Sequence, residues 1–155
     1  IAQLYNQLYG ISTIGLRFFT VYGPRGRPDM APFKFLKAIS TGQTFDKYGT
    51  GETYRDYTYV SDIVNGIKSA IINKNKIKCE VYNLGNGNPI KLNKFIKICE
   101  TVTGKEAVYN QLPDQPGDVP KTFADITKAT KDLDYKPKVT FEEGLQYMYN
   151  WLKNE

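Results

Sequence analysis

The chain has 155 residues, of which 41% are hydrophobic and 24% charged, a composition typical of one soluble globular domain that can bury a core. Its net charge of +5 comes from lysines interleaved with acidic residues over several segments, a pattern that indicates a solvated surface and argues against a nucleic-acid partner. No apolar run approaches the ~20 residues of a membrane helix, and the lack of histidine excludes a Cys/His zinc site, so we expect neither membrane nor metal binding.

The N-terminal part of the sequence predicts a helix, a strand, a loop and a second helix. Apolar residues at helical spacing predict a helix over residues 2–9, stopped by Gly10. Residues 12–19 predict a strand covered on both faces, because they are apolar and aromatic towards their end. Two prolines and two glycines impose a loop on residues 23–29, and a helix is predicted over residues 31–41. A helix followed by a buried strand is typical of a crossover in a parallel α/β sheet.

Short elements alternate in the middle of the chain. Strands are predicted over residues 44–48, 55–60 and 80–84. Ser61 or Asp62 is expected to cap a helix that lies between the last two of these strands. The residues expected on the buried face of this helix are Ile63, Ile67, Ala70 and Ile71.

The C-terminal part predicts three more helices. A turn over residues 85–89 is followed by a helix that begins at or just before Asn93. A short strand at 107–110 and an extended proline-rich loop at 112–120 come next. The last two helices are predicted around residues 126–133 and 141–152. The core residues expected from the first and last of these three helices are Leu92, Phe95, Ile96, Cys99, Leu145, Met148, Tyr149 and Leu152.

The end of the first strand and the loop after it form the first candidate binding site. Open α/β sheets bind ligands beyond the ends of their strands, which here places Thr20 at the site. Arg27 carries a planar fork that matches a carboxylate or a phosphate, and Pro24 and Pro28 stiffen the loop around it. The alternative, which the spacing alone favours, is that Arg25 and Arg27 are solvated loop arginines.

Two later segments hold further candidate residues. The Gly-x-Gly turn at 49–51 leads to Arg55, so backbone N–H groups and one guanidinium could meet a phosphate. The alternative is a hairpin turn with a structural Arg55–Asp56 pair. Asp118 lies between glycine and proline residues and could accept hydrogen bonds from a ribose diol, the alternative being a surface turn. Without histidine no Ser-His-Asp or Cys-His set exists, so the residues alone indicate an anion-binding surface without acid–base machinery.

Four segments together resemble the nucleotide-sugar epimerases of the extended short-chain dehydrogenase/reductase family: 16–24, 55–63, 82–87 and 115–120. Thr20 and the loop at 25–30 are most similar to the UDP-glucuronate 4-epimerase branch. The resemblance covers the whole chain. It implies an α/β fold that is the C-terminal part of a Rossmann-type enzyme, with the last sheet strands and a small mixed α/β sugar-nucleotide-binding domain. Residues 1–22 would end the Rossmann domain, and residues 23–155 would form mainly the substrate domain, with some segments returning to the Rossmann sheet.

The resemblance also implies an activity for the intact protein. Such enzymes invert C4 of UDP-glucuronate, or a related UDP-sugar, through a transient 4-keto intermediate with bound NAD. No catalytic residue is expected in this chain, because the Tyr-x-x-x-Lys pair of the family would lie upstream of Ile1. The chain alone would therefore be the inactive, substrate-binding portion, with NAD held mainly by the missing N-terminal half. A homodimer is expected for the intact protein, and its two free thiols, Cys79 and Cys99, favour the cytoplasm.

Residue roles follow from the same resemblance. Thr20 and Arg27 would hold the sugar carboxylate. Arg55 would bind the diphosphate, and Asp118 the ribose. Gln115 stands where many relatives carry an arginine that aids the diphosphate, a variant that favours the glucuronate branch. The remaining implied contacts are those of Met30, Ala31, Asp46 and Tyr48 with the nucleotide, and those of Phe18 and Phe19 with the nicotinamide.

Two alternatives to the epimerase interpretation stay open. One is a sugar-nucleotide-binding or oligomerisation module without catalysis. The other is a UDP-sugar decarboxylase or dehydratase, which shares the scaffold and differs mainly in residues upstream of this chain. In either case the strand at 12–19 would normally pair inside a larger sheet, so by itself it is expected to expose an apolar edge.

Overall fold

A computed structural model describes the backbone of residues 1–155 and every side chain except that of Asn75. The helices are α1 (Ala2–Tyr9), α2 (Ala31–Thr41), α3 (Val60–Asn73), α4 (Leu92–Thr103), α5 (Thr127–Leu133) and α6 (Phe141–Leu152), with a short 3-10 helix at Lys74–Lys76. The strands are β1 (Thr13–Phe18), β2 (Thr20–Tyr22), β3 (Phe45–Tyr48), β4 (Tyr54–Arg55), β5 (Tyr57–Tyr59), β6 (Cys79–Leu84), β7 (Ile90–Lys91) and β8 (Tyr109–Leu112).

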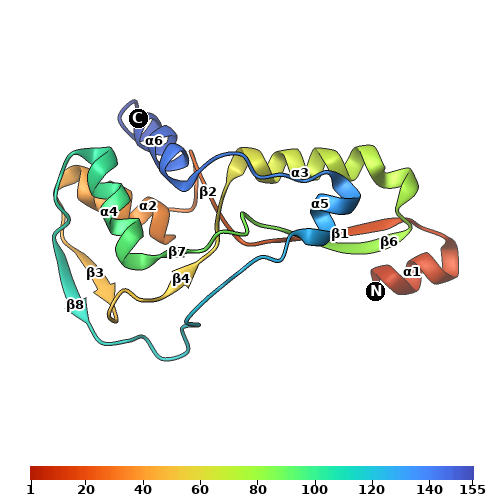
Figure 1. Cartoon of the computed structure of the whole chain (residues 1–155), viewed down its shortest axis with the longest axis horizontal. Coiled ribbons are helices and arrows are strands. Elements are labelled where there is room, and N and C mark those ends of the chain that lie inside the picture. The colour runs from red at the N-terminus through yellow and green to blue at the C-terminus, as the bar shows by residue number, and fades with distance from the viewer.

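The strands pair across long stretches of sequence. β1 pairs with β6, β2 with β5 and β3 with β8, all in parallel, whereas β4 and β7 pair antiparallel. Parallel partners need a crossover connection, and helices supply it here, as in the βαβ unit. The predicted α/β class is therefore confirmed, and the chain divides into two lobes seen side by side in Figure 1.

One lobe, here called the aromatic lobe, is built from α2, α4 and α6 with β3, β4, β5, β7 and β8 (Figure 1). The three helices pack against one another. Their core is a stack of rings: the centroid of Phe95 lies 5.4 Å from that of Phe35 and 5.2 Å from that of Phe141. Tyr57 of β5 stacks on Phe141 at 4.9 Å. Aromatic pairs at these distances add to the free energy of burial.

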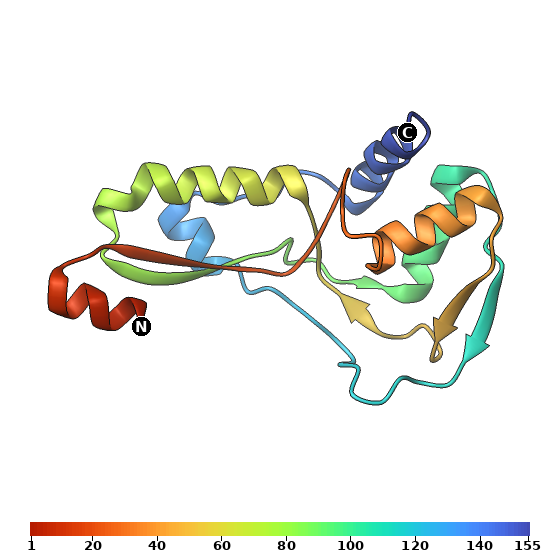
Figure 2. The same ribbon diagram turned by 180° about the vertical axis from the view of Figure 1, so that it is seen from behind.

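The second lobe, here called the sheet lobe, consists of β1 and β6 with α3 and α5 (Figures 1 and 2). Its core contains Ile63 and Ala70 from α3, Tyr82 and Leu84 from β6, and Leu133 from α5. The short helix α1 lies at the outer end of these strands and contacts both of them. The sheet lobe thus combines the first 18 residues with segments from the middle and the end of the chain.

The prediction that residues 12–19 are covered on both faces is wrong for this chain. β1 pairs along one edge only, with β6, and the other edge has no partner strand among the described residues. The faces are also incompletely covered, because no residue of β1 is buried and Phe18 is 49% exposed. The expectation of an exposed apolar edge is confirmed by the same observations.

The prediction that a side chain of Ser61 or Asp62 caps α3 is also wrong. The helix begins at Val60, with Tyr59 as N-cap residue, and neither Ser61 nor Asp62 caps it by a side-chain hydrogen bond. The Asp62 carboxylate instead accepts the N–H groups of Lys138 and Val139 at 3.1 and 3.0 Å, which joins α3 to the segment before α6.

Ile71, expected in the core, is 60% exposed. One residue along an α-helix turns the side chain by about 100°, so Ile71 points away from the face that buries Ala70. The strand expected at 107–110 lies two residues later, at Tyr109–Leu112, where it is in register with Phe45–Tyr48.

The start of α6 depends on a close approach that only glycine allows. Thr140 and Glu143 form a capping box, in which each side chain meets the backbone N–H of the other residue. A Cβ on Gly144 would lie 2.1 Å from the hydroxyl oxygen of Tyr22, whose ring is buried among other aromatic rings.

Replacing Gly144 by Ala is therefore expected to lower the free energy of unfolding by about 1–3 kcal/mol, in spite of the higher helix propensity of alanine. Urea unfolding followed by circular dichroism measures the change. Asn150→Ala, at an exposed position of the same helix, is the control. A Gly144→Ala protein as stable as the control would contradict the packing seen at Tyr22.

Candidate functional site

Thr20 is the first residue of β2 and lies where the two lobes meet, with only Phe19 between it and the end of β1. The N–H of Phe19 donates to the carbonyl of Leu84 at 3.2 Å, and the N–H of Thr20 donates to the carbonyl of Asp56 at 3.2 Å. The chain therefore changes partner strand at this point, from β6 to β5. Such a change leaves side chains at the strand ends open to a ligand.

The loop after β2 is fixed by two tight turns. The N–H of Gly26 donates to the carbonyl of Gly23 at 3.1 Å, and the N–H of Met30 donates to the carbonyl of Arg27 at 3.3 Å. Arg25 occupies the left-handed region with φ 59°, which costs free energy for a residue other than glycine. The loop then enters α2 with Pro32 in its first turn. These constraints fix the backbone at Arg27, and with it the point from which the side chain extends.

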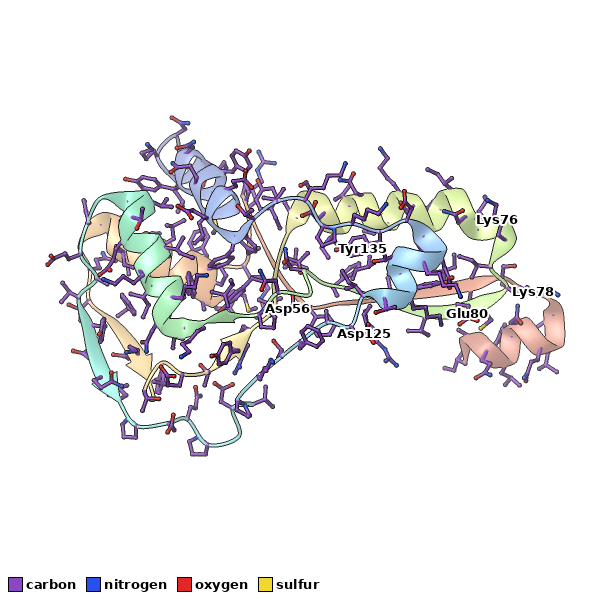
Figure 3. All side chains as sticks on the ribbon, viewed as in Figure 1. Asp56, Lys76, Lys78, Glu80, Asp125 and Tyr135 are labelled. Atoms are coloured by element: carbon purple, nitrogen blue, oxygen red, sulfur yellow. The ribbon has the colours of Figure 1, made fainter. Side chains whose placement is uncertain are left out.

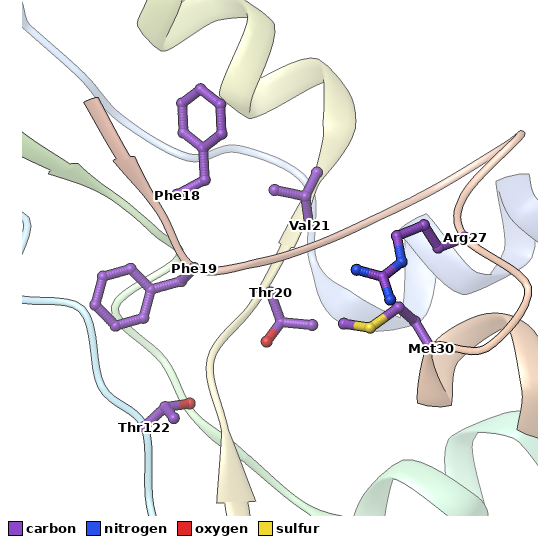
Figure 4. A pocket seen from close by; sticks show the side chains of 7 residues that line it. All are labelled: Phe18, Phe19, Thr20, Val21, Arg27, Met30 and Thr122. Atoms are coloured by element: carbon purple, nitrogen blue, oxygen red, sulfur yellow. The ribbon is translucent and has the colours of Figure 1, made fainter. Parts of the chain in front are cut away.

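Arg27 lines a pocket of about 510 Å³, here called the Arg27 pocket. Figure 4 shows its guanidinium extending towards Met30 and Thr20, with the two phenylalanines on the opposite side. The residues that line the Arg27 pocket are Phe18, Phe19, Thr20, Val21, Arg27, Met30 and Thr122. The pocket thus combines one cation with two aromatic rings and two hydroxyl groups.

A second pocket, of about 440 Å³, adjoins the first and is here called the Arg55 pocket. Thr20 and Met30 line both pockets, which are therefore adjacent and are together called the recess here. The other residues of the Arg55 pocket are Asp29, Ala31, Pro32, Phe35, Tyr48, Thr53, Arg55, Tyr57, Leu92, Gln115 and Asp118.

Arg55 and Asp118 form an ion pair inside the Arg55 pocket. The side chain of Arg55 is 20% exposed and that of Asp118 is 49% exposed. Nη1 of Arg55 also donates to the carbonyl of Tyr54 at 2.8 Å. The Arg55–Asp56 pair considered as a structural alternative is therefore wrong, because Arg55 is paired with a residue of the distant proline-rich loop.

Asp56 has a different role, at the junction of the lobes (Figure 3). It is fully buried, and its carboxylate accepts the N–H groups of Asn86, Gly87 and Ala124 at 2.8, 3.0 and 2.9 Å. Its own N–H donates to Oγ1 of Thr122 at 2.9 Å, which places Thr122 at the Arg27 pocket. A buried carboxylate with three donors joins the strand end at Arg55 to both neighbouring segments.

Tyr57 lies next to these charges, at the wall of the Arg55 pocket. Burial raises the pKa of its hydroxyl well above the ordinary value, and the nearby Arg55 charge only partly opposes this shift. The hydroxyl therefore stays protonated and uncharged at neutral pH.

Most of the residues singled out from the sequence come together in this recess. Phe18, Phe19 and Arg27 line the first pocket, and Thr20 and Met30 line both. The predicted residues found in the second pocket are Ala31, Tyr48, Arg55, Gln115 and Asp118.

Asp46 is the exception, because it lines neither pocket. Its carboxylate accepts a hydrogen bond from Asn110 at 3.0 Å, and it borders a separate hollow beside α2. The lining residues that sequence reasoning missed are Val21, Asp29, Pro32, Phe35, Thr53, Tyr57, Leu92 and Thr122. Only Tyr57 carried a signal in the sequence, because it directly follows the Arg55–Asp56 pair.

The described side chains limit the chemistry of the recess. They contain no group of three or more histidine, cysteine or carboxylate residues placed to hold a metal ion. Burial raises the pKa of the Cys99 thiol well above its usual range, so it is not a nucleophile at neutral pH. The recess offers two arginines, hydroxyl donors and aromatic walls, which suit binding of an elongated anion.

Among the described residues, no helix is long and apolar enough to cross a membrane.

Comparison with known proteins gives a consistent result. The chain is 53% identical over 150 residues to an uncharacterized protein of Methanocaldococcus jannaschii, covering 97% of this chain and 45% of that protein. It is 42% identical to a UDP-glucuronate 4-epimerase of Thermodesulfobacterium geofontis, covering 99% of this chain and 47% of the relative. The chain thus spans about half the length of the curated relatives it matches.

Solved structures agree with these sequence relatives. The crystal structure of UDP-glucuronic acid 4-epimerase from Bacillus cereus, in complex with UDP-glucuronic acid and NAD, superposes with a TM-score of 0.90 at 36% identity, over 99% of this chain and 49% of that one. The predicted resemblance to nucleotide-sugar epimerases is confirmed by these matches. Residues 1–148 match the GDP-mannose 4,6 dehydratase family, and the chain belongs to that family.

Proposed function

We propose that this chain is the substrate-binding half of an NAD-dependent UDP-glucuronate 4-epimerase. The observation that carries the proposal is the placement of two arginines on two adjoining pockets. UDP-glucuronate has two separate anionic parts, a diphosphate and a sugar carboxylate. A recess with one guanidinium for each part suits this ligand better than a UDP-sugar whose sugar carries no charge.

Each pocket then takes one part of the substrate. Arg55 binds the diphosphate, and Asp118 turns from Arg55 to the ribose hydroxyls when the nucleotide enters. Tyr48, Met30 and Ala31 border the nucleotide on the other side, and Gln115 adds an amide to the same pocket.

Thr20 and Arg27 bind the sugar carboxylate in the Arg27 pocket. The hydroxyl of Thr20 donates one hydrogen bond, and the guanidinium of Arg27 donates two to a carboxylate placed in its plane. A firm hold on the nucleotide fits a reaction in which the sugar must turn over within the site. The proton acceptor for the sugar 4-hydroxyl is proposed to lie on a part of the protein outside these 155 residues.

NAD fits the aromatic side of the same recess. Phe18 and Phe19 lie on the side of the Arg27 pocket away from Arg27, and the ring of Phe18 is half exposed (Figure 4). These rings would border the nicotinamide, and the bound cofactor would supply hydride acceptance and return at C4.

The test of the proposal is the selectivity of an Arg27→Leu protein. The variant is expected to lose about 2–4 kcal/mol of binding free energy for UDP-glucuronate, because a charge-assisted pair is removed and a carboxylate is left unpaired. Its affinity for UDP-glucose is expected to change little. Isothermal titration calorimetry with both ligands measures the difference.

Arg25→Asn is the matched control for this experiment. It removes a positive charge from the same loop, but Arg25 lines neither pocket, and asparagine tolerates the left-handed backbone at this position. The control should bind both ligands as the wild type does. Equal losses for UDP-glucuronate and UDP-glucose in Arg27→Leu would refute a carboxylate-binding role for Arg27.

A further inference from the structure

Arg27 already has a carboxylate partner within its own loop. Its Nε donates to Oδ1 of Asp29 at 3.1 Å, and its Nη2 donates to Oδ2 at 2.5 Å. The two parallel bonds make a bidentate pair along the side edge of the guanidinium. The hydrogen bond lowers the pKa of Asp29 and raises that of Arg27, so both groups stay charged over the neutral range.

The backbone between the two residues limits how this pair can move. Pro28 separates them, and its ring fixes φ near −65°. The N–H of Met30 closes a turn onto the carbonyl of Arg27, and α2 begins directly after Met30. The carboxylate of Asp29 is therefore presented from a constrained turn that ends on a helix.

The end edge of the guanidinium is not used by this pair. Nη1 of Arg27 has no hydrogen-bond partner among the described residues, and Nη2 carries a second hydrogen. Figure 4 shows this end of the side chain directed towards Met30 and Thr20, within the Arg27 pocket. A guanidinium has five N–H donors, so one carboxylate on its side edge leaves a second fork for another carboxylate.

We infer that Asp29 is a positioning residue, which holds Arg27 by its side edge so that its end edge meets the carboxylate of a uronic acid substrate. The inference rests on the proposed function, because it assumes that the ligand of Arg27 is the sugar carboxylate. Without Asp29 the long side chain of Arg27 would sample several rotamers. The binding free energy of the substrate would then have to offset the entropy lost when this side chain is ordered. Asp29 thereby contributes to the preference for uronic acids through Arg27, without itself binding the sugar carboxylate.

The opposite effect is also physically possible, and the direction of the change in affinity distinguishes the two. Asp29 carries the same charge as the sugar carboxylate, so it could instead compete for Arg27 and weaken uronate binding. Removing Asp29 then separates the two cases. A positioning role predicts weaker binding of UDP-glucuronate, whereas competition predicts tighter binding.

The experiment measures dissociation constants for UDP-glucuronate, UDP-glucose and UDP by calorimetry, for the wild type, Asp29→Asn and Asp29→Ala. Both variants are expected to bind UDP-glucuronate about tenfold more weakly, a change of about 1.4 kcal/mol. Asp29 also lines the Arg55 pocket, so loss of its charge affects all three ligands alike, and the tenfold loss is therefore measured for UDP-glucuronate relative to UDP-glucose and UDP. Asp29→Ala removes the side chain and its steric effects, so agreement between the two variants excludes an artefact of the amide.

Asp134→Asn is the matched control. Asp134 forms the same kind of exposed pair, with Lys136 two residues later at 2.6 Å, and it lines neither pocket. Its left-handed backbone, with φ 51°, suits asparagine well. This variant should leave all three affinities unchanged, which shows that loss of a surface ion pair alone does not alter binding.

Two results would overturn the inference alone. The first is a wild type that prefers UDP-glucuronate, together with Asp29→Asn and Asp29→Ala proteins that keep this preference. The second is the same wild type together with variants that bind UDP-glucuronate more tightly. A wild type with no preference for UDP-glucuronate over UDP-glucose would instead overturn the proposed function, and the inference with it.

Discussion

An Asp56→Ala protein is expected to unfold with about 3–5 kcal/mol less free energy than the wild type, because one buried and two part-buried N–H donors lose their acceptor. The carboxylate is fully buried and accepts hydrogen bonds from Asn86, Gly87 and Ala124. No other side-chain oxygen accepts these three N–H groups among the described residues. Urea unfolding followed by circular dichroism measures the loss.

Two further variants make this result specific. Asp56→Asn keeps the size of the side chain but turns one acceptor oxygen into a donor, so an intermediate loss is expected. Asp114→Ala removes an exposed carboxylate and should change the unfolding free energy by no more than about 0.5 kcal/mol. If Asp56→Ala is no less stable than Asp114→Ala, the carboxylate does not join the lobes as described.

The second large effect is expected in the aromatic lobe, for Phe95→Ala. Phe95 is fully buried and its ring lies 5.2 to 5.4 Å from those of Phe35, Tyr57 and Phe141. Truncation removes a large apolar surface and leaves a cavity, which costs about 3–5 kcal/mol of unfolding free energy. The same urea titration measures it.

Phe95→Leu and Phe123→Ala serve as comparisons for the second experiment. Leucine fills part of the space, so its cost should be clearly smaller than that of alanine. Phe123 is 54% exposed, and its truncation should cost less than about 1 kcal/mol. Similar losses for Phe95→Ala and Phe123→Ala would show that the ring stack is not the core of this lobe.

The sequence predicted best those elements whose sequence features lie within the element itself. The helices at Ala2–Tyr9, Ala31–Thr41 and Phe141–Leu152 have the predicted bounds, because apolar periodicity and a stop or cap residue lie within each segment. The α3 helix was harder, because the buried carboxylate of Asp62 looks like a cap in sequence and meets donors at 138 and 139 in space.

The candidate site shows the same limit. Arg27 and Arg55 could be identified as anion-binding candidates from their loops, and the family resemblance related them to one ligand. The role of Asp56 could not be found in this way, since its partners lie 30 or more residues away. The spacing alone favoured a solvated Arg27, and its side chain is exposed; it also lines a pocket, and its binding of an anion stays a prediction.

The parallel strand pairs also determine how this chain must fold. Thr13 of β1 and Cys79 of β6 are 66 residues apart, and Asp46 of β3 and Asn110 of β8 are 64 residues apart. Neither pair can form until a long intervening segment has been placed, so closure entropy is lost before the contacts that offset it are made. During synthesis β1 leaves the ribosome well before β6, so its apolar residues have no partner strand until β6 has been made. These non-local pairs are therefore expected to form late in folding, and β1 is expected to be exposed to misassociation until β6 is available.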